Sequence, residues 1–139
     1  LEGYESIRNE VRYGKNSRID ILLEGPARPP CYVEIKNVTL SRRPGHAEFP
    51  DAATARGLKH LDELAAMARS GARAVMFYLV QRGDAKNFAI ASDIDPAYHA
   101  AWINARAAGV ETMAWSCHIT PHEIELDRAL PVAAPPQNG

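Results

Sequence analysis

The sequence is poor in cysteine and has no excess of charge of either sign. Its two cysteines, Cys31 and Cys117, lie far apart and belong to no CxxC or cysteine/histidine cluster. This argues against a zinc site and is typical of a cytoplasmic protein. Acidic and basic residues nearly cancel, to a formal net charge of -1. A nucleic-acid partner would therefore have to be bound by local basic patches rather than by a global field.

Long hydrophobic runs are also missing. No stretch reaches the ~18 apolar residues that a membrane-spanning helix needs, and no basic segment followed by an apolar one marks a secretory signal. We therefore expect no membrane partner. The chain opens with Leu1 rather than methionine, as we expect of a fragment of a longer protein.

What the sequence does contain is ordinary for a globular domain. It has 139 residues, of which 46% are hydrophobic and 24% are charged, and this fits one domain with a buried core. We expect that domain to occupy residues 1–130. Residues 131–139 are rich in proline, alanine and polar residues, and are predicted to be a flexible tail with nothing to bury.

The order of the predicted elements indicates an α/β fold. Turn-like and proline-rich breaks separate three strand-like segments that predict an antiparallel meander, at residues 6–13, 18–23 and 31–38. A polar loop is expected at residues 41–50. The later elements alternate in type: a helix at 52–70, a fully apolar strand at 74–80, a helix at 96–108, a strand at 110–119 and a candidate short strand at 123–130.

Three acidic residues are predicted to line up across the meander. If each hairpin is symmetric about its loop, the first is centred on Lys15 and places Glu10 opposite Asp20, and the second places Asp20 opposite Glu34. Side chains alternate between the faces of a strand, so Lys36 projects on the side of Glu34. The opposite face is apolar and is expected to form a layer of the core, made of Ile19, Ile21, Leu23, Cys31, Val33 and Ile35.

This row of side chains predicts a metal site. Carboxylates that face one another repel, and a bound cation compensates for the repulsion. Oxygen ligands from Glu10, Asp20 and Glu34 favour Mg²⁺ or Mn²⁺, while Lys36 would orient or deprotonate an attacking water or offset negative charge. The expected reaction is metal-assisted phosphodiester hydrolysis. The alternative interpretation is a solvated sheet face with a cross-strand salt bridge.

At these residues the sequence also resembles the sugar fermentation stimulation protein A (SfsA) family. The resemblance rests on segments that follow one another in order over most of the chain, at residues 10–20, 32–40, 49–52, 56–61, 81–82 and 93–96. It implies a bacterial or archaeal cytoplasmic protein, described as DNA-binding, with a restriction-endonuclease-like PD-(D/E)XK domain. In the family a smaller OB-fold-like domain normally precedes this one, and we expect this chain to lack it.

The PD-(D/E)XK signature maps onto Asp20 as the first acid and onto Glu34-Ile35-Lys36 as the second acid and lysine. The proline that precedes the first acid in the motif is missing here. The fold expected from the resemblance and the pattern together is a mixed sheet in which the antiparallel meander is followed by αβαβ.

Other polar residues are weaker candidates, each with a structural alternative. Asp51 either caps the first helix or lies near the metal, and Gln81 either enters the site or marks the emergence of its strand into solvent. Five residues are candidates for contacts with nucleic acid, the alternatives being turn chemistry, surface ion pairs or a solvated helix face: Lys15, Arg18, Arg56, Lys59 and His60. For His60 the choice is between the catalytic side and a solvated helix face.

Three functions remain open from the sequence. The leading hypothesis is a metal-dependent nuclease acting on DNA, with RNA as a further substrate to consider and a homodimer as a common state of such nucleases. The second is a non-catalytic DNA-binding transcriptional regulator of sugar metabolism genes on the same scaffold. The third is a structural interaction domain whose acidic row is vestigial.

Overall fold

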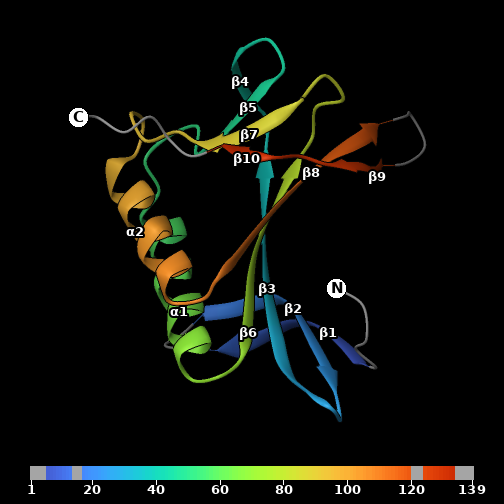
Figure 1. The fold of residues 1–139 in the computed structure, drawn as a ribbon, viewed down its shortest axis with the longest axis vertical. Helices are drawn as coiled ribbons and strands as arrows, with labels where there is room; N and C mark the ends of the chain where they lie inside the picture. The colour runs from blue at the N-terminus through green and yellow to red at the C-terminus, as the bar shows by residue number, and fades with distance from the viewer. Residues whose placement is uncertain (1–5, 14–16, 120–123, 134–139) are drawn as a thin grey trace.

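The computed structural model shows a mixed α/β molecule built on a curled sheet (Figure 1). It describes the backbone of residues 6–13, 17–119 and 124–133, and the side chains of residues 20–118 and 125–132. Within these residues the larger sheet has the order β1-β2-β3-β6-β8-β9. Its strands are β1 (Ser6–Tyr13), β2 (Ser17–Gly25), β3 (Arg28–Val38), β6 (Arg73–Val80), β8 (Glu111–Ile119) and β9 (Ile124–Ala129).

The first three strands are antiparallel neighbours, as the turns predicted. β3, β6 and β8 then run parallel, and β9 returns antiparallel to β8. β6 therefore lies in the middle of the parallel part of the sheet. Its residues Val75, Met76 and Tyr78 are fully buried, as expected of a strand that is covered on both faces.

A second sheet corrects the polar loop that was expected at residues 41–50. This segment forms β4 (Leu40–Arg43) and β5 (His46–Phe49), joined at Gly45, whose φ of 76° is easily adopted only by glycine. The sheet has the order β10-β7-β5-β4, with β7 (Asn87–Ile90) and β10 (Val132–Ala133) as its other strands. The observed order of elements is thus longer than the expected βββαβαβ.

The chain after residue 130 also differs from the expected tail. β10 pairs parallel with β7, and the Phe88 amide donates to the Pro131 carbonyl at 3.0 Å. Val132 packs against the main core, so the chain does have something to bury here. Residues 134–139 lie outside the described residues.

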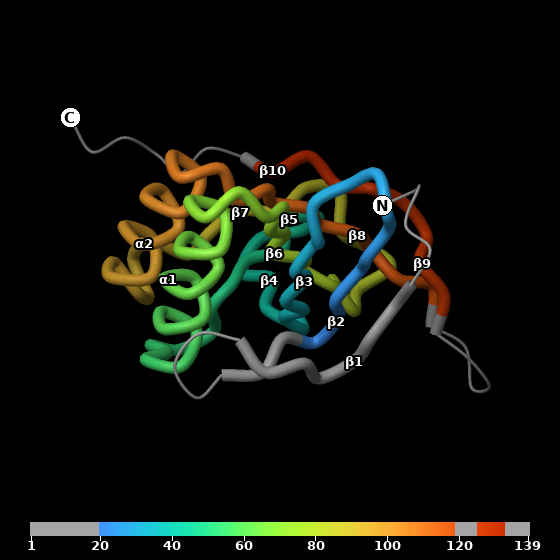
Figure 2. The backbone as a smooth tube through the Cα atoms, turned by 90° about the horizontal axis from the view of Figure 1, so that it is seen from below, coloured from blue at the N-terminus to red at the C-terminus, as the bar shows by residue number. Residues whose placement is uncertain are grey.

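Two helices pack side by side on one side of the curled sheet, as Figure 2 shows. α1 (Ala55–Arg69) begins three residues later than predicted, because Thr54 rather than Asp51 is its N-cap and accepts a bond from the Gly57 amide at 2.9 Å. α2 (Pro96–Ala107) follows the prediction closely. Within the described residues, neither helix is long and apolar enough to span a bilayer.

The core is divided between the two faces of the sheet. The larger cluster lies under the helices and contains Leu22, Val38, Leu61, Met76 and Trp102. A smaller cluster contains Leu23, Cys31, Val33 and Val75, with Ile21 and Ile35 against it. The predicted apolar face is therefore real, but it forms the smaller cluster, and the main core shares the face of the carboxylates.

The proline-rich break before the third strand is shorter than expected. β3 begins at Arg28 and includes Pro29 and Pro30, which are exposed. Its pairing with β6 starts only at Cys31. The prolines therefore lie outside the pairing with β6 and at the register shift of β2 between Leu23 and Gly25, where no backbone donor is required of them.

Candidate active site

The register of the first three strands brings the predicted acidic residues together. Ile21 pairs with Val33 and Leu22 with Tyr32. The same register, extended by one residue, places Asp20 beside Glu34. In the first hairpin Asn9 pairs with Ile21 and Val11 with Ile19, so the backbone of Glu10 lies across from Asp20. This is the register that hairpin symmetry predicts. The side chain of Glu10 lies outside the described residues.

Helix α1 covers the face of β3 that carries Glu34 and Lys36. Glu34 is only 4% exposed, and His60 of α1 is 6% exposed. An ionisable pair at this depth loses most of its hydration, which is unfavourable unless other groups compensate. Glu34 therefore does not lie on a solvated sheet face, which was the alternative interpretation of this row of side chains.

Asp20 is held in place by the backbone of the next strand. Its Oδ2 accepts a hydrogen bond from the Ile35 amide at 2.8 Å. Burial raises the pKa of Asp20, and the negative charge of Glu34 raises it further, against the opposing effect of the Ile35 bond and of Lys36. Asp20 and Glu34 are thus two neighbouring carboxylates that both interact with the positive charge of Lys36.

Lys36 and His60 lie beside Glu34. The Lys36 Nζ atom is 2.8 Å from His60 Nδ1 and 3.7 Å from Glu34 Oε1, and His60 Nδ1 is 3.2 Å from the same oxygen. Burial lowers the pKa of Lys36; Glu34 raises it, and the positive charge of Arg56 lowers it again. An amine in such surroundings gives up a proton more readily than a lysine in water.

The second oxygen of Glu34 is available for a ligand. Glu34 Oε2 is buried and has no hydrogen-bond partner among the described residues. In that part of the chain, however, no three histidine, cysteine, aspartate or glutamate side chains lie close enough together to hold a metal ion by themselves. Of the three predicted metal ligands, the structure therefore describes the side chains of two, Asp20 and Glu34.

The structure places the weaker candidates at different distances from this cluster. Arg56, in the first turn of α1, is exposed and close enough for its charge to act on Lys36. Lys59 is exposed and pairs with Glu63 at 3.9 Å along the helix. The side chains of Lys15 and Arg18 lie outside the described residues.

Asp51 and Gln81 belong to other surroundings. Asp51 is exposed in a bend before α1, and it does not cap the helix, because Thr54 does. The Gln81 side chain donates to Asn37 Oδ1 at 3.0 Å. Asn37 is exposed and alternates in face with Lys36, so this pair marks the solvent-exposed end of the strands.

The inward position of His60 decides between the two orientations that the sequence leaves open for it, the catalytic side and a solvated helix face. The structure buries His60 against Glu34 and Lys36. The signal was present in the helical spacing. Gly57, His60, Leu61 and Leu64 follow the i, i+3, i+4, i+7 pattern of a buried stripe, and all four are buried.

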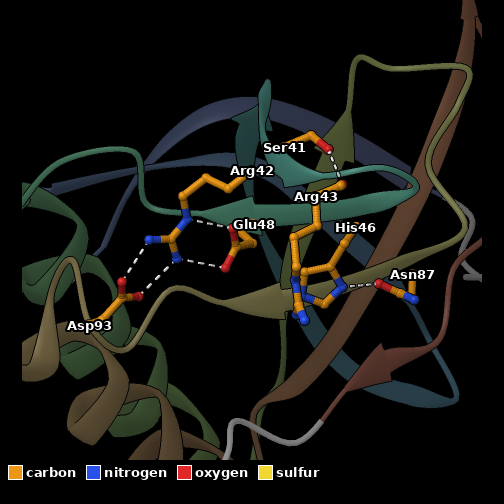
Figure 3. A network of polar contacts seen from close by, with 7 residues as sticks. All are labelled: Ser41, Arg42, Arg43, His46, Glu48, Asn87 and Asp93. Carbon is orange, nitrogen blue, oxygen red and sulfur yellow. Dashed lines mark hydrogen bonds and ion pairs between the residues drawn. The ribbon is translucent and has the colours of Figure 1, made fainter.

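A second polar network lies on the smaller sheet (Figure 3). Arg42 donates from Nε and Nη2 to both oxygens of Glu48, each at 2.7 Å. The same guanidinium donates from Nη1 and Nη2 to Asp93, at 2.6 and 2.8 Å. His46 contacts Asn87 beside it. The Arg42 guanidinium is bonded to two carboxylates. The network therefore links β4, β5 and the loop that follows β7.

Comparisons with known proteins find relatives that match most of this chain. The family model described as sugar fermentation stimulation protein RE domain matches residues 1–123. The sugar fermentation stimulation protein homologue of Roseobacter denitrificans is 57% identical over 132 residues, covering 95% of this chain and 56% of the relative. The homologue of Ruegeria pomeroyi is 59% identical over 126 residues, covering 91% of this chain and 55% of the relative.

A solved structure is similar over nearly the whole chain. It is the Pyrococcus furiosus SfsA protein in complex with Ca²⁺, with a TM-score of 0.87 and 32% identity, covering 96% of this chain and 57% of that one. The chain spans about half the length of the curated relatives it matches.

Proposed function

The chain belongs to the sugar fermentation stimulation protein (SfsA) family, and from this membership and its buried acidic cluster we propose a divalent-metal-dependent nuclease of the PD-(D/E)XK type that acts on DNA. The proposal rests on one observation above all. Asp20, Glu34 and Lys36, from neighbouring strands, converge under a helix, and one oxygen of Glu34 has no partner there among the described residues. A structural salt bridge has no need of the second acid.

The donor set is suited to a hard cation. Two carboxylates, with waters and a phosphate oxygen completing the shell, are a common way in which proteins bind Mg²⁺ or Mn²⁺. The backbone position of Glu10 across from Asp20 offers a place for a third carboxylate. The similar Pyrococcus furiosus protein was solved with Ca²⁺, which supports a divalent-cation site in this chain as well.

Each residue of the cluster then has a distinct role in hydrolysis. Asp20 and Glu34 would hold the cation, which when bound supplies Lewis acidity toward a phosphate oxygen and a bound water. Lys36 can orient the attacking water or take its proton, since its surroundings lower its pKa. Arg56, exposed beside Lys36, can contact a phosphate flanking the scissile bond.

DNA is the proposed partner, and it has to be bound by local groups because the formal net charge is only -1. Arg56 and Lys59 are candidates from the first turns of α1, and the charge of Arg56 acts on Lys36. Lys15 and Arg18 are further candidates from the first hairpin. A regulator that binds DNA without cutting it would use the same contacts. RNA is the second substrate to be tried.

The proposal is tested by incubating the protein with supercoiled plasmid and with labelled DNA and RNA oligonucleotides in Mg²⁺, Mn²⁺, Ca²⁺ or EDTA. We expect cleavage in Mg²⁺ or Mn²⁺ and none in EDTA. Asp20→Ala and Lys36→Ala should each lower the rate at least a hundredfold, because each removes a group that contacts the metal or the water.

Asp62→Asn is the matched control, since Asp62 is an exposed carboxylate of α1 outside the cluster. It should cleave like the wild type. Metal-dependent cleavage that persists in both cluster variants would sink the nuclease proposal. Salt-sensitive binding without strand scission in any metal would favour the regulator instead.

A further inference from the structure

The protons shared by Lys36 and His60 can be assigned from chemistry. In its charged form Lys36 has three N–H donors and no acceptor, so in that form the Nδ1 atom of His60, 2.8 Å from Lys36 Nζ, accepts the bond. The ring proton of His60 then lies on Nε2. It follows that His60 Nδ1 and Glu34 Oε1, which are 3.2 Å apart, are both acceptors and cannot bond to each other.

The ammonium is consequently bonded to the histidine rather than to the carboxylate. Lys36 Nζ is 3.7 Å from Glu34 Oε1, which is beyond the 2.7–2.9 Å of a charge-assisted hydrogen bond. The other oxygen of Glu34 is buried and without a hydrogen-bond partner in the described part of the chain. Glu34 therefore keeps its ligand capacity although a cation of the protein lies beside it.

We propose that His60 is a positioning residue that holds the Lys36 ammonium away from Glu34, and thereby keeps the Glu34 carboxylate free to bind the divalent cation. The inference rests on the metal site of the proposed function. Without the imidazole, the Glu34 carboxylate 3.7 Å away remains beside Lys36, and the lysine side chain can shorten this distance to form a tight ion pair. That ion pair would compete with the metal for the same oxygens.

The position of His60 is well supported for this role. It is 6% exposed and lies one helical turn before Leu64 in α1, whose residues Leu61 and Leu64 are fully buried in the main core. The Thr54 cap fixes the start of the same helix. A side chain on a rigid, packed helix can hold its partner in one place at low entropic cost.

The test is a calorimetric Ca²⁺ titration of six proteins: wild type, His60→Ala, His60→Asn, Lys36→Met, the double variant Lys36→Met/His60→Ala, and His118→Ala. We expect His60→Ala to weaken Ca²⁺ binding about tenfold. His60→Asn should bind within about threefold of the wild type, because the asparagine carbonyl lies near the place of Nδ1 and accepts the same bond. His118 is exposed on β8, and its removal should change nothing.

The double variant separates positioning from a general structural effect. If His60 acts through Lys36, then Lys36→Met and the double variant bind Ca²⁺ with equal affinity, at least as tightly as the wild type. Equal Ca²⁺ affinity of wild type and His60→Ala overturns the inference and leaves the metal site standing. A tenfold loss that persists in the double variant also overturns it.

If the wild type binds no Ca²⁺, the proposed function fails, and the contact itself is then tested by acetylating the metal-free proteins and measuring Lys36 modification by mass spectrometry. The exposed Lys86 serves as the internal reference. Lys36 should be modified at least threefold more slowly in His60→Ala, because Glu34 then protects the ammonium, and at the wild-type rate in His60→Asn. An unchanged Lys36 rate in His60→Ala overturns the inference in this case too.

Discussion

At the scale of single residues, Arg42 governs the charges of the smaller sheet. Arg42 lies at a register shift of β4, between Ser41 and Arg43. Bulges of this kind change the direction of side chains. Its planar fork meets Glu48 and Asp93, and the bonds from Arg42 lower the pKa of both acids, that of Asp93 to about 2. These acids are therefore more acidic in the folded protein than in the unfolded chain.

This difference predicts an acid limb of stability. Because the folded pKa of Asp93 lies below its ordinary value of 3.8, its contribution is present above pH 3.8 and is lost as the pH falls through about 2. Asp93→Asn should flatten the fall of the unfolding free energy over that window, measured by urea denaturation at a series of pH values. The exposed Asp62→Asn variant should keep the wild-type slope, and an Asp93→Asn slope equal to it contradicts the prediction.

The residues of the site were predictable to different degrees. Turn symmetry and strand parity were enough to align Glu10, Asp20 and Glu34 and to put Lys36 on the same face, since these are local properties of hairpins. The partner of Lys36 was not predictable from its own segment. His60 lies 24 residues away, and only the packing of α1 on β3 decides which face of that helix turns inward.

At the scale of elements, one buried carboxylate ties the two helices together. Asp95 accepts from the Tyr98 amide at 3.0 Å as the N-cap of α2, and from the Thr54 amide at 2.9 Å at the start of α1. It is buried. One side chain thus satisfies donors at two helix starts that lie 41 residues apart in the chain.

Removal of this carboxylate should cost more than the loss of a single cap. We expect Asp95→Ala to lower the unfolding free energy by about 2–3 kcal/mol, since two amides lose their acceptor and at least one of them is buried. Asp95→Asn, which keeps one acceptor, should cost about half of that. Equilibrium urea unfolding measures both, and a loss in Asp95→Ala no larger than the ~1 kcal/mol expected for Thr54→Ala would contradict the double role.

The strands of the smaller sheet show why some elements escape sequence analysis. Residues 41–50 carry charges where a short strand is expected to be apolar, so they resemble a loop. In the folded protein Glu48 is buried because Arg42 neutralises it, and Asp93, 51 residues away, completes the set. The hydrophobic pattern of residues 41–50 alone does not reveal that Asp93 pairs with Arg42.

At the scale of the whole molecule, the cluster links two strands of the larger sheet to a helix. Asp20 comes from β2, Glu34 and Lys36 from β3 and His60 from α1. A cation that binds here contacts only the folded arrangement, because the unfolded chain holds these residues far apart. Binding is therefore linked to global stability.

That linkage gives a prediction that needs no substrate. Ca²⁺ at a hundred times its dissociation constant should raise the unfolding free energy of the wild type by about 2.7 kcal/mol. Asp20→Asn and Glu34→Gln should show little of this gain, and Asp62→Asn all of it. Thermal unfolding in Ca²⁺ and in EDTA makes the comparison, and an equal gain in Glu34→Gln would place the cation elsewhere.

The parallel pairing of β3 with β6 also has a consequence in time. Cys31 lies beside Arg73 and Val38 beside Val80, so this pairing closes a loop of roughly forty residues, with α1 and therefore His60 inside it. Contacts of such sequence separation form late in folding. A cation bound at the cluster should then leave the refolding rate almost unchanged and slow the unfolding rate, so that it acts as a lock on the finished structure rather than as a guide to its formation.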